Sequence, residues 1–276
     1  MKTVTDAPMG SFWVRFGGSL LRAGVASRSW ARTRYEAIAP EFRTQIGETP
    51  LLALSALAPG QMPTHTVRDD GHRLIVFVHG LAGHRGNFLP MQCYFRWMGR
   101  SRTVSVGFPN RNSIEEMAEH LRSTIERLAR ENRLPKEKSI DIVAHSMGGL
   151  ITRLALKDPE IASRVHTVIT LATPHNGTQL ARYLDTLKLR ALQPSSQLLR
   201  ELRCQLPWGS DPLMPRLICF WTPKDLVLLP PRSAVVEGAE EVCIPESTHL
   251  GFMLKPTVWE LIFRILTPNL LETRAA

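Results

Sequence analysis

The chain contains the stretch Ile140-Asp-Ile-Val-Ala-His-Ser146-Met-Gly-Gly-Leu150, in which a short apolar run ends in Ala-His-Ser-Met-Gly and a helix-forming segment follows at once. A sharp turn from a strand into a helix is a known mount for a nucleophilic serine, because it exposes the hydroxyl at its tip. The backbone of such a serine is strained, so the residues two positions away on either side must be small. Ala144 and Gly148 meet that requirement, and Gly149 gives the helix room to pack close to the sheet. We therefore interpret Ser146 as a candidate nucleophile.

Composition and charge limit the classes of partner. The 276 residues, with 43% hydrophobic and 21% charged side chains, are enough for one large globular α/β domain. The net charge is +9; residues 7–35 contain five Arg and no acid, and residues 71–114 contain six Arg and no acid. A basic surface can attract nucleic acid or anionic lipid. No run combines basic and aromatic residues as a nucleic-acid platform does, so we predict no nucleic-acid partner and either a solvated basic surface or peripheral contact with an anionic membrane.

Cysteine usage and the N-terminus favour a cytoplasmic location. The four cysteines are widely spaced without a metal-ligand pattern, so we predict no metal, and Cys219 and Cys243 lie in apolar runs typical of a core. The apolar stretch 11–26 is interrupted by Arg15 and Arg22, which argues against a signal peptide. No apolar run approaches the 18 residues of a transmembrane helix. No segment predicts a cofactor.

Strand-like and helix-like segments alternate from about residue 63. Continuous apolar runs such as Arg73–Val78 are typical of parallel strands buried on both faces. The alternation therefore predicts an α/β fold with a mainly parallel sheet and helices on both faces. The expected strands are 73–78, 103–108, 140–144, 165–171, 216–221 and 241–244. The expected helices are 86–98, a helix that begins at the capping box Ser113–Glu116 and is closed by Leu134-Pro135, a helix from about 148, and a last helix that begins at Pro256 and ends just before Pro268.

Two segments stand outside this alternation. Residues 1–62 form an Arg-rich, partly amphipathic extension before the predicted domain at 63–276, with apolar positions at Phe12, Trp13, Phe16, Leu20 and Leu21. Such a segment either lies on a membrane surface, packs on the domain or is partly disordered. Residues 178–215 form a long excursion between two predicted strands.

A serine hydroxyl needs a base to remove its proton and an acid to orient that base. In one common arrangement the acid and the histidine follow the serine in that order. Of the histidines after Ser146, only His249 follows a loop that could carry the acid and precedes the last helix. Asp225 directly follows the strand 216–221 and is the favoured acid; Asp211, which precedes that strand, is the weaker candidate.

An oxyanion needs two backbone donors, and the stretch Val76–Gly83 provides a place for one. Gly80 lets the loop turn under the site, so that the Leu81 N–H can point at the reacting carbonyl beside the Met147 N–H. We assign His79, Gly80 and His145 to the surroundings of the bound substrate. His79 is expected to hold the loop, and His145 is expected to support the turn by packing.

With these parts placed, the chain resembles the α/β-hydrolase family, and within it the bacterial triacylglycerol lipases and esterases, including relatives of the GPI-inositol deacylases. The resemblance spans about residues 74–265 and implies a triad of Ser146, Asp225 and His249. It also implies that residues 178–215 form a cap or lid over an acyl pocket, and that His175 is structural. The motifs that carry it are 78–83, 144–149, 170–175, 194–199 and 249–252.

The predicted activity is hydrolysis of carboxylic esters through an acyl-enzyme intermediate, and lipid esters are the favoured substrates. An acyltransferase or thioesterase could use the same three residues, and a non-catalytic binding protein of the same fold is a further alternative. A complete set of catalytic elements argues against the last of these.

Overall fold

The computed structural model describes residues 43–44, 47–50, 67–108, 113–183, 187–203 and 208–268. The chain divides into two compact units, Met1–Arg43 and Thr44–Ala276, and the account below concerns the second. The predicted amphipathic positions Phe12, Trp13, Phe16, Leu20 and Leu21 lie outside the described residues.

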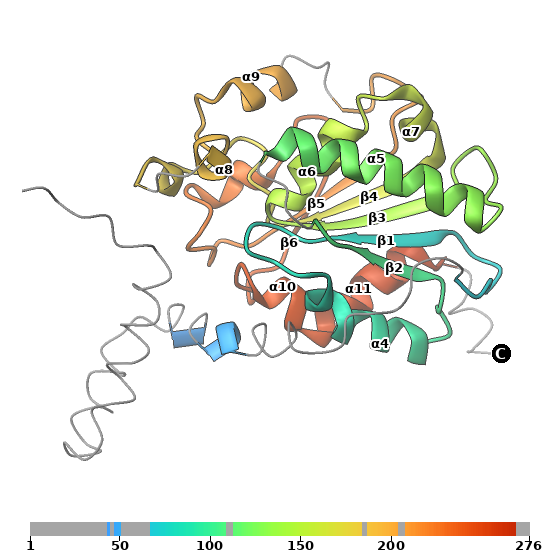
Figure 1. Cartoon of the computed structure of the whole chain (residues 1–276). Coiled ribbons are helices and arrows are strands. Elements are labelled where there is room, and N and C mark those ends of the chain that lie inside the picture. Colours follow the sequence, from blue (N-terminus) through green and yellow to red (C-terminus); the bar gives the residue numbers. More distant parts are fainter. Residues whose placement is uncertain are drawn as a thin grey trace, which may run out of the picture. The chain divides into compact units, whose positions relative to one another are not determined.

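A six-stranded sheet forms the centre of the second unit (Figure 1). Its strand order is β2-β1-β3-β4-β5-β6, and every neighbouring pair is parallel. The predicted parallel sheet is therefore confirmed, and parallel pairing brings the carboxyl ends of all strands to one edge. The strands are β1 Leu74–Val78, β2 Thr103–Val106, β3 Ile140–His145, β4 Val165–Leu171, β5 Arg216–Trp221 and β6 Glu240–Cys243.

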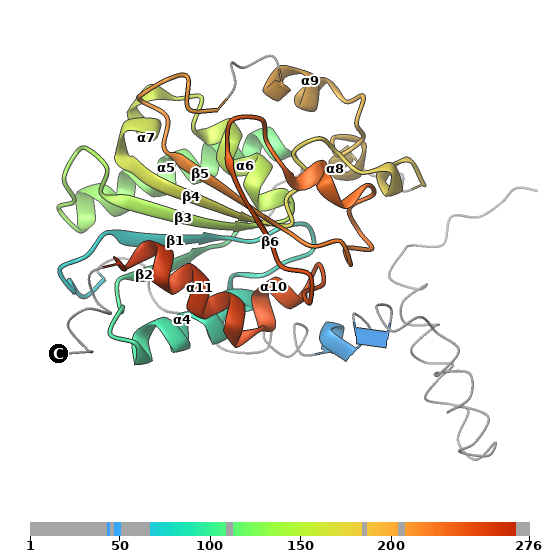
Figure 2. The ribbon, with the colours of Figure 1, turned by 180° about the vertical axis from the view of Figure 1, so that it is seen from behind.

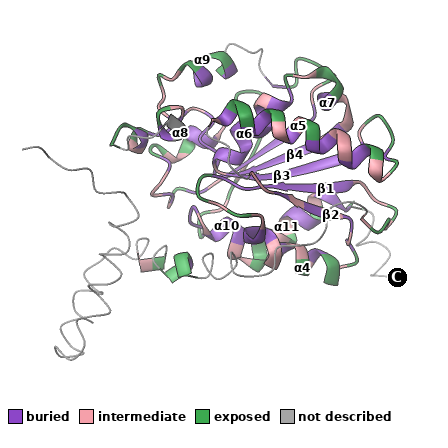
Figure 3. Ribbon diagram, viewed as in Figure 1, coloured by how far each residue is buried: buried purple, intermediate pink, exposed green. Residues whose placement is uncertain are grey.

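Helices cover both faces of the sheet (Figures 1 and 2). One face carries α5 Ile114–Glu131, α6 Met147–Ala155 and α7 Pro159–Arg164. The other carries α4 Leu89–Trp97, preceded by the 3-10 turn η1 Arg85–Phe88, together with α10 Gly251–Leu254 and α11 Pro256–Leu266. The sheet is consequently enclosed, as the burial of its central strands shows (Figure 3).

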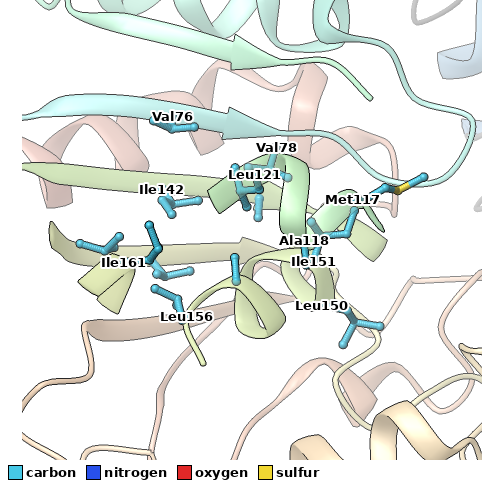
Figure 4. Packing of buried hydrophobic residues seen from close by; sticks show 14 of the residues in the cluster. Val76, Val78, Met117, Ala118, Leu121, Ile142, Leu150, Ile151, Leu156 and Ile161 are labelled. Carbon is cyan, nitrogen blue, oxygen red and sulfur yellow. The ribbon is translucent and has the colours of Figure 1, made fainter. Parts of the chain in front are cut away.

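Each face of the sheet has its own hydrophobic cluster. Successive side chains of a strand point to opposite faces, so Val76 and Val78 of β1 pack with α5 and α6, whereas Phe77 packs with α4 and α11. Figure 4 shows the first cluster, in which Leu121 of α5 and Ile151 of α6 meet the strands.

Helix α5 begins where its sequence predicts. The Ser113 hydroxyl accepts a hydrogen bond from the Glu116 N–H at 3.1 Å, which caps the first turn. The helix ends at Glu131, before the predicted Leu134-Pro135, because Arg133 adopts a φ of 49° and the chain turns there. All its predicted apolar positions are buried: Ile114, Met117, Ala118, Leu121, Ile125 and Leu128.

The excursion between β4 and β5 is packed against the domain over its described part. It contains η2 Gln179–Tyr183, α8 Leu187–Arg190 and α9 Gln197–Arg203. Leu199 and Leu202 of α9 join the cluster beneath α5 and α6. Arg153 of α6 donates a hydrogen bond to the Leu202 carbonyl at 2.8 Å, and its guanidinium lies over the Trp208 ring. These contacts attach α9 and the more distant Trp208 to α6.

The predicted core position of Cys243 is wrong. Cys219, in the interior of β5, is buried, but Cys243 is exposed. The reason is that β6 is the edge strand of the sheet, and its residues are exposed or only partly buried. An apolar sequence run does not distinguish an edge strand from a central one.

A buried ion pair fixes the amino-terminal edge of the sheet. The Arg100 side chain is 1% exposed; it donates to the Arg73 and Leu266 carbonyls, and its Nε lies 3.6 Å from Asp70 Oδ2. That same oxygen accepts hydrogen bonds from the Ser101 and Arg102 N–H groups. One carboxylate thus neutralises a buried cation and holds the start of β2.

Asp70→Ala should lower the free energy of unfolding by about 3–5 kcal/mol, because it leaves Arg100 buried without its counter-charge. The matched control is Asp69→Ala. The Asp69 side chain pairs with Arg102 but is 68% exposed, so its removal should lower the free energy of unfolding by about 1 kcal/mol or less. Urea unfolding of both variants measures the difference. If both variants lost the same free energy of unfolding, the buried ion pair would contribute no more to stability than the exposed one, and the prediction would be wrong.

Candidate active site

Ser146 occupies a strained turn between β3 and α6. Its φ is 53° and its ψ is −128°, a conformation that costs a non-glycine residue about 1–3 kcal/mol. The turn is held because the Ser146 N–H donates to the Leu171 carbonyl of β4 at 2.8 Å. The serine side chain is thereby presented at the carboxyl edge of the sheet.

Glycines allow this turn to pack closely against its neighbours. A Cβ on Gly148 would lie 2.5 Å from the Val78 carbonyl oxygen, and a Cβ on Gly149 would lie 2.2 Å from Thr173 Oγ1. Both approaches are shorter than a real Cβ contact. The glycines predicted after Ser146 are therefore required by the close approach of the Val78 carbonyl at the end of β1 and of the Thr173 side chain after β4.

The structure brings Ser146, His249 and Asp225 together from three separate loops. His249 Nε2 lies 3.2 Å from Ser146 Oγ, and His249 Nδ1 lies 2.9 Å from Asp225 Oδ2. The imidazole and carboxylate are 5% and 2% exposed. The alternative acid, Asp211, lies elsewhere and accepts a hydrogen bond from the Leu213 N–H.

Asp225 is held as a carboxylate. Burial alone would raise the pKa of Asp225, but the facing His249 and the N–H groups of Leu228 and Val227 outweigh burial and hold that pKa below its ordinary value. The two N–H groups donate to Oδ1 at 2.8 and 2.9 Å. The remaining oxygen, Oδ2, can therefore accept the Nδ1–H of His249 and fix which ring nitrogen faces the serine.

Contacts with the neighbouring backbone hold the His249 loop. Thr222 donates its hydroxyl to the Ser247 carbonyl at 3.1 Å. The Thr248 hydroxyl donates to the buried carboxylate of Glu48 and accepts from the Gly251 N–H. Glu48 lies 200 residues earlier in the chain, and no sequence pattern indicated its contact with this loop.

His145 supports the loop from the other side. Its Nε2–H donates to the His249 carbonyl at 2.8 Å, and the two rings lie edge to face with centroids 4.9 Å apart. Burial, together with the nearby His249, lowers the pKa of His145 from 6.5 to about 3. The packing contact predicted for His145 is thus accompanied by a hydrogen bond from a neutral ring.

The loop after β1 passes close to the serine. A Cβ on Gly80 would lie 2.8 Å from Ser146 Cβ and 3.2 Å from the Met147 nitrogen. Met147 is the first residue of α6, where N–H groups have no acceptor within the helix. Leu81 follows Gly80 with its side chain 38% exposed. His79 is buried, and its Nδ1 lies 2.9 Å from the Gly80 carbonyl oxygen.

The other two histidines after Ser146 lie away from this cluster. His175 Nε2 is 3.1 Å from Thr170 Oγ1, and burial, with Arg153 nearby, lowers the pKa of His175 well below its ordinary value. His166 Nδ1 is 3.5 Å from Asp141 Oδ1, near the start of the strands. Among the residues that the structure describes, no group of three or more His, Cys, Asp or Glu could hold a metal ion.

Acid should destabilise the protein through His145. Because the folded protein keeps this ring neutral down to about pH 3, while the unfolded chain binds a proton below about pH 6.5, lowering the pH favours unfolding. Between pH 7 and pH 5 this residue alone should cost about 2 kcal/mol. His145→Gln should therefore lose less stability than the wild type over that interval, measured by urea unfolding. The same loss in both proteins would contradict the prediction.

Known proteins resemble parts of this chain. The PGAP1-like alpha/beta domain family matches residues 106–194, which include Ser146 but neither Asp225 nor His249. The GPI inositol-deacylase of Kluyveromyces lactis is 39% identical over 61 residues, 22% of this chain and 6% of that protein. Triacylglycerol lipase 2 of Saccharomyces cerevisiae is 31% identical over 102 residues, 35% of this chain and 31% of that protein. The matches thus span less than a third of either curated relative.

Structural similarity extends over more of the chain. The crystal structure of Aspergillus fumigatus lipase B superimposes with a TM-score of 0.61 and 19% identity, covering 76% of this chain and 55% of that one. No described helix is long and apolar enough to cross a membrane. The parallel sheet, the helices on both of its faces and these similarities together identify the chain as a protein of the α/β-hydrolase fold, with its central residues similar to the PGAP1-like alpha/beta domain.

Proposed function

We propose that the protein is a serine hydrolase that cleaves carboxylic esters through an acyl-enzyme intermediate, in the manner of a lipase or carboxylesterase. The observation that carries this proposal is the hydrogen-bonded series from Asp225 through His249 to Ser146. A carboxylate, an imidazole and a hydroxyl in this order form the arrangement that activates a serine for attack on an ester carbonyl.

In the first half of the reaction His249 Nε2 takes the hydroxyl proton while Ser146 Oγ attacks the carbonyl carbon. The ester bond then breaks, and the alcohol leaves with the proton held by His249. In the second half a water molecule gives its proton to His249 and attacks the acyl group on Ser146. The acid leaves and the serine regains its proton.

Backbone N–H groups stabilise the oxyanion in this mechanism. Met147 begins α6, so its N–H is free of intrahelical bonding and coincides with the positive end of the helix dipole. Leu81 supplies the second N–H, from the loop whose Gly80 comes close to Ser146. Each such donor should lower the activation barrier by about 3–4 kcal/mol.

Lipid esters are the substrate class that we favour. This preference is supported by two proteins that resemble parts of this chain and that are named as lipases, a triacylglycerol lipase and a lipase B. The proposal includes residues 178–215 as a cap beside the acyl site; the attachment of α9 to α6 through Arg153 would make part of this cap fixed. Peripheral contact of the basic surface with anionic lipid belongs to the same proposal.

Ser146→Ala should reduce kcat/KM for a p-nitrophenyl ester by about 10⁴-fold or more, because no other group would accept the acyl chain. The matched control is Ser123→Ala, which removes an exposed hydroxyl from α5 that donates a hydrogen bond to the His120 carbonyl. Circular dichroism and thermal unfolding establish that both variants are folded. Full activity in folded Ser146→Ala protein would overturn the proposed function.

A further inference from the structure

A cavity lies beside the loop that follows β1. Its volume is about 420 Å³. Its wall is formed by residues 79 and 83–85 of that loop, by β2 with the two residues after it, and by α5. The cavity therefore lies at the carboxyl edge of the sheet, next to the loop that approaches Ser146.

Five of the twelve described residues that line this cavity have basic side chains. Arg85, Arg127, His79, His84 and His120 contribute to it, and no Asp or Glu is found among the described residues that line it. Such a concentration of donors and positive charge in a concave site attracts anions.

The arginines of the acid-free stretch 71–114 differ in how they are used. Arg73, Arg100 and Arg102 pair with Asp141, Asp70 and Asp69 at the opposite edge of the sheet. Arg85, at the cavity, has no hydrogen-bond or ion-pair partner among the described residues. Its charge consequently remains available to a ligand.

Two further groups at the cavity can donate hydrogen bonds. His84 Nδ1 accepts a hydrogen bond from the Gly86 N–H at 3.1 Å, so the neutral ring carries its proton on Nε2 as a donor. Arg127 Nη1 lies 3.4 Å from Glu131 Oε2, a single contact that occupies one of the five N–H donors of the guanidinium. Thr124 adds a hydroxyl to the same wall.

The cavity and the candidate active site share one loop. His79 and Gly83 line the cavity, while Gly80 between them reaches Ser146. The turn is closed by a hydrogen bond from the Gly83 N–H to the Gly80 carbonyl at 3.1 Å. A ligand in the cavity would thus lie against the loop that carries the proposed oxyanion donor Leu81.

We propose that this cavity binds a phosphate group, either as the headgroup of a lipid ester whose acyl chain reaches Ser146 or as free phosphate. Arginine forks suit the several acceptor oxygens of a phosphate. The volume exceeds what one phosphate needs and leaves room for a glycerol-sized alcohol beside it. The headgroup form of the inference rests on the proposed ester hydrolysis, whereas binding of free phosphate does not.

The first arm of the test measures binding without catalysis. Inorganic phosphate is titrated calorimetrically into Ser146→Ala protein, alone and combined with Arg85→Gln or Arg127→Gln, which lie on different elements. Loss of one charge-assisted hydrogen bond should weaken saturable binding about tenfold or more. The control is Arg130→Gln, which removes the same charge from an exposed site on α5 and should leave binding unchanged.

The second arm compares phosphatidate with diacylglycerol of the same acyl chains, both in detergent micelles, as substrates of the protein with Ser146 intact. Arg85→Gln and Arg127→Gln should raise KM for phosphatidate about tenfold and leave KM for diacylglycerol unchanged. An effect in this arm identifies a lipid headgroup as the ligand; an effect in the first arm alone identifies free phosphate.

The inference is overturned if neither arm depends on Arg85 or Arg127 while thermal unfolding shows both variants folded. It is also overturned if Arg130→Gln reproduces their effects, because attraction by net charge would then suffice. Absence of ester hydrolysis by the protein with Ser146 intact would instead count against the proposed function, and the titration with phosphate would still decide whether the cavity binds.

Discussion

The turn at Ser146 is the constraint on which the arrangement of the site depends. A serine with a φ of 53° is stable only where surrounding contacts compensate for its strain. Those contacts join Ser146 to β4 through the Leu171 carbonyl, and the start of α6 to the end of β1 through Gly148. β1, β3 and β4 are adjacent in the sheet. The strained conformation of Ser146 therefore depends on the relative positions of these three strands.

The histidine facing this turn is held by contacts from distant parts of the chain. Asp225 orients its ring, His145 bonds its carbonyl, and Glu48 bonds the neighbouring Thr248. The loops that carry Asp225 and His249 follow β5 and β6, which are separated from β3 by one strand, β4, and by two strands, β4 and β5, respectively. Both loops therefore leave the same carboxyl edge of the sheet as the turn at Ser146. In the proposed mechanism, preorganisation of this kind would keep Ser146 and His249 near their working geometry before a substrate binds.

Much of this arrangement was predictable because it rests on regular patterns. Apolar runs predicted the six strands, with β4 and β5 at their observed bounds. The order of serine, acid and histidine predicted that Ser146, Asp225 and His249 would meet; their distances agree with that order, and their catalytic roles stay predictions. Short helices were missed: α10 begins at a glycine, a poor helix former, and its four residues depend on packing.

Contacts without a periodic signal could not be predicted. The bond from Thr248 to Glu48 joins residues 200 positions apart, and neither side chain lies in a recognisable motif. The exposure of Cys243 depends on β6 being an edge strand, which only the strand order reveals. The cavity at Arg85 likewise arises where a loop, a strand end and a helix meet. The acid-free stretch 71–114 indicated surplus charge, but it could not distinguish Arg85 from the arginines that are paired.

The most direct measurement of the proposed chemistry is the mass of the protein itself during turnover. Reaction with p-nitrophenyl butyrate is quenched in acid within milliseconds, and the intact chain and its peptides are weighed. The proposed mechanism predicts one added butyryl group, on the peptide that contains Ser146, appearing before steady-state release of butyrate. Ester hydrolysis with the butyryl group on another residue, or with no acylated protein under conditions where p-nitrophenol is released in a burst, would contradict it.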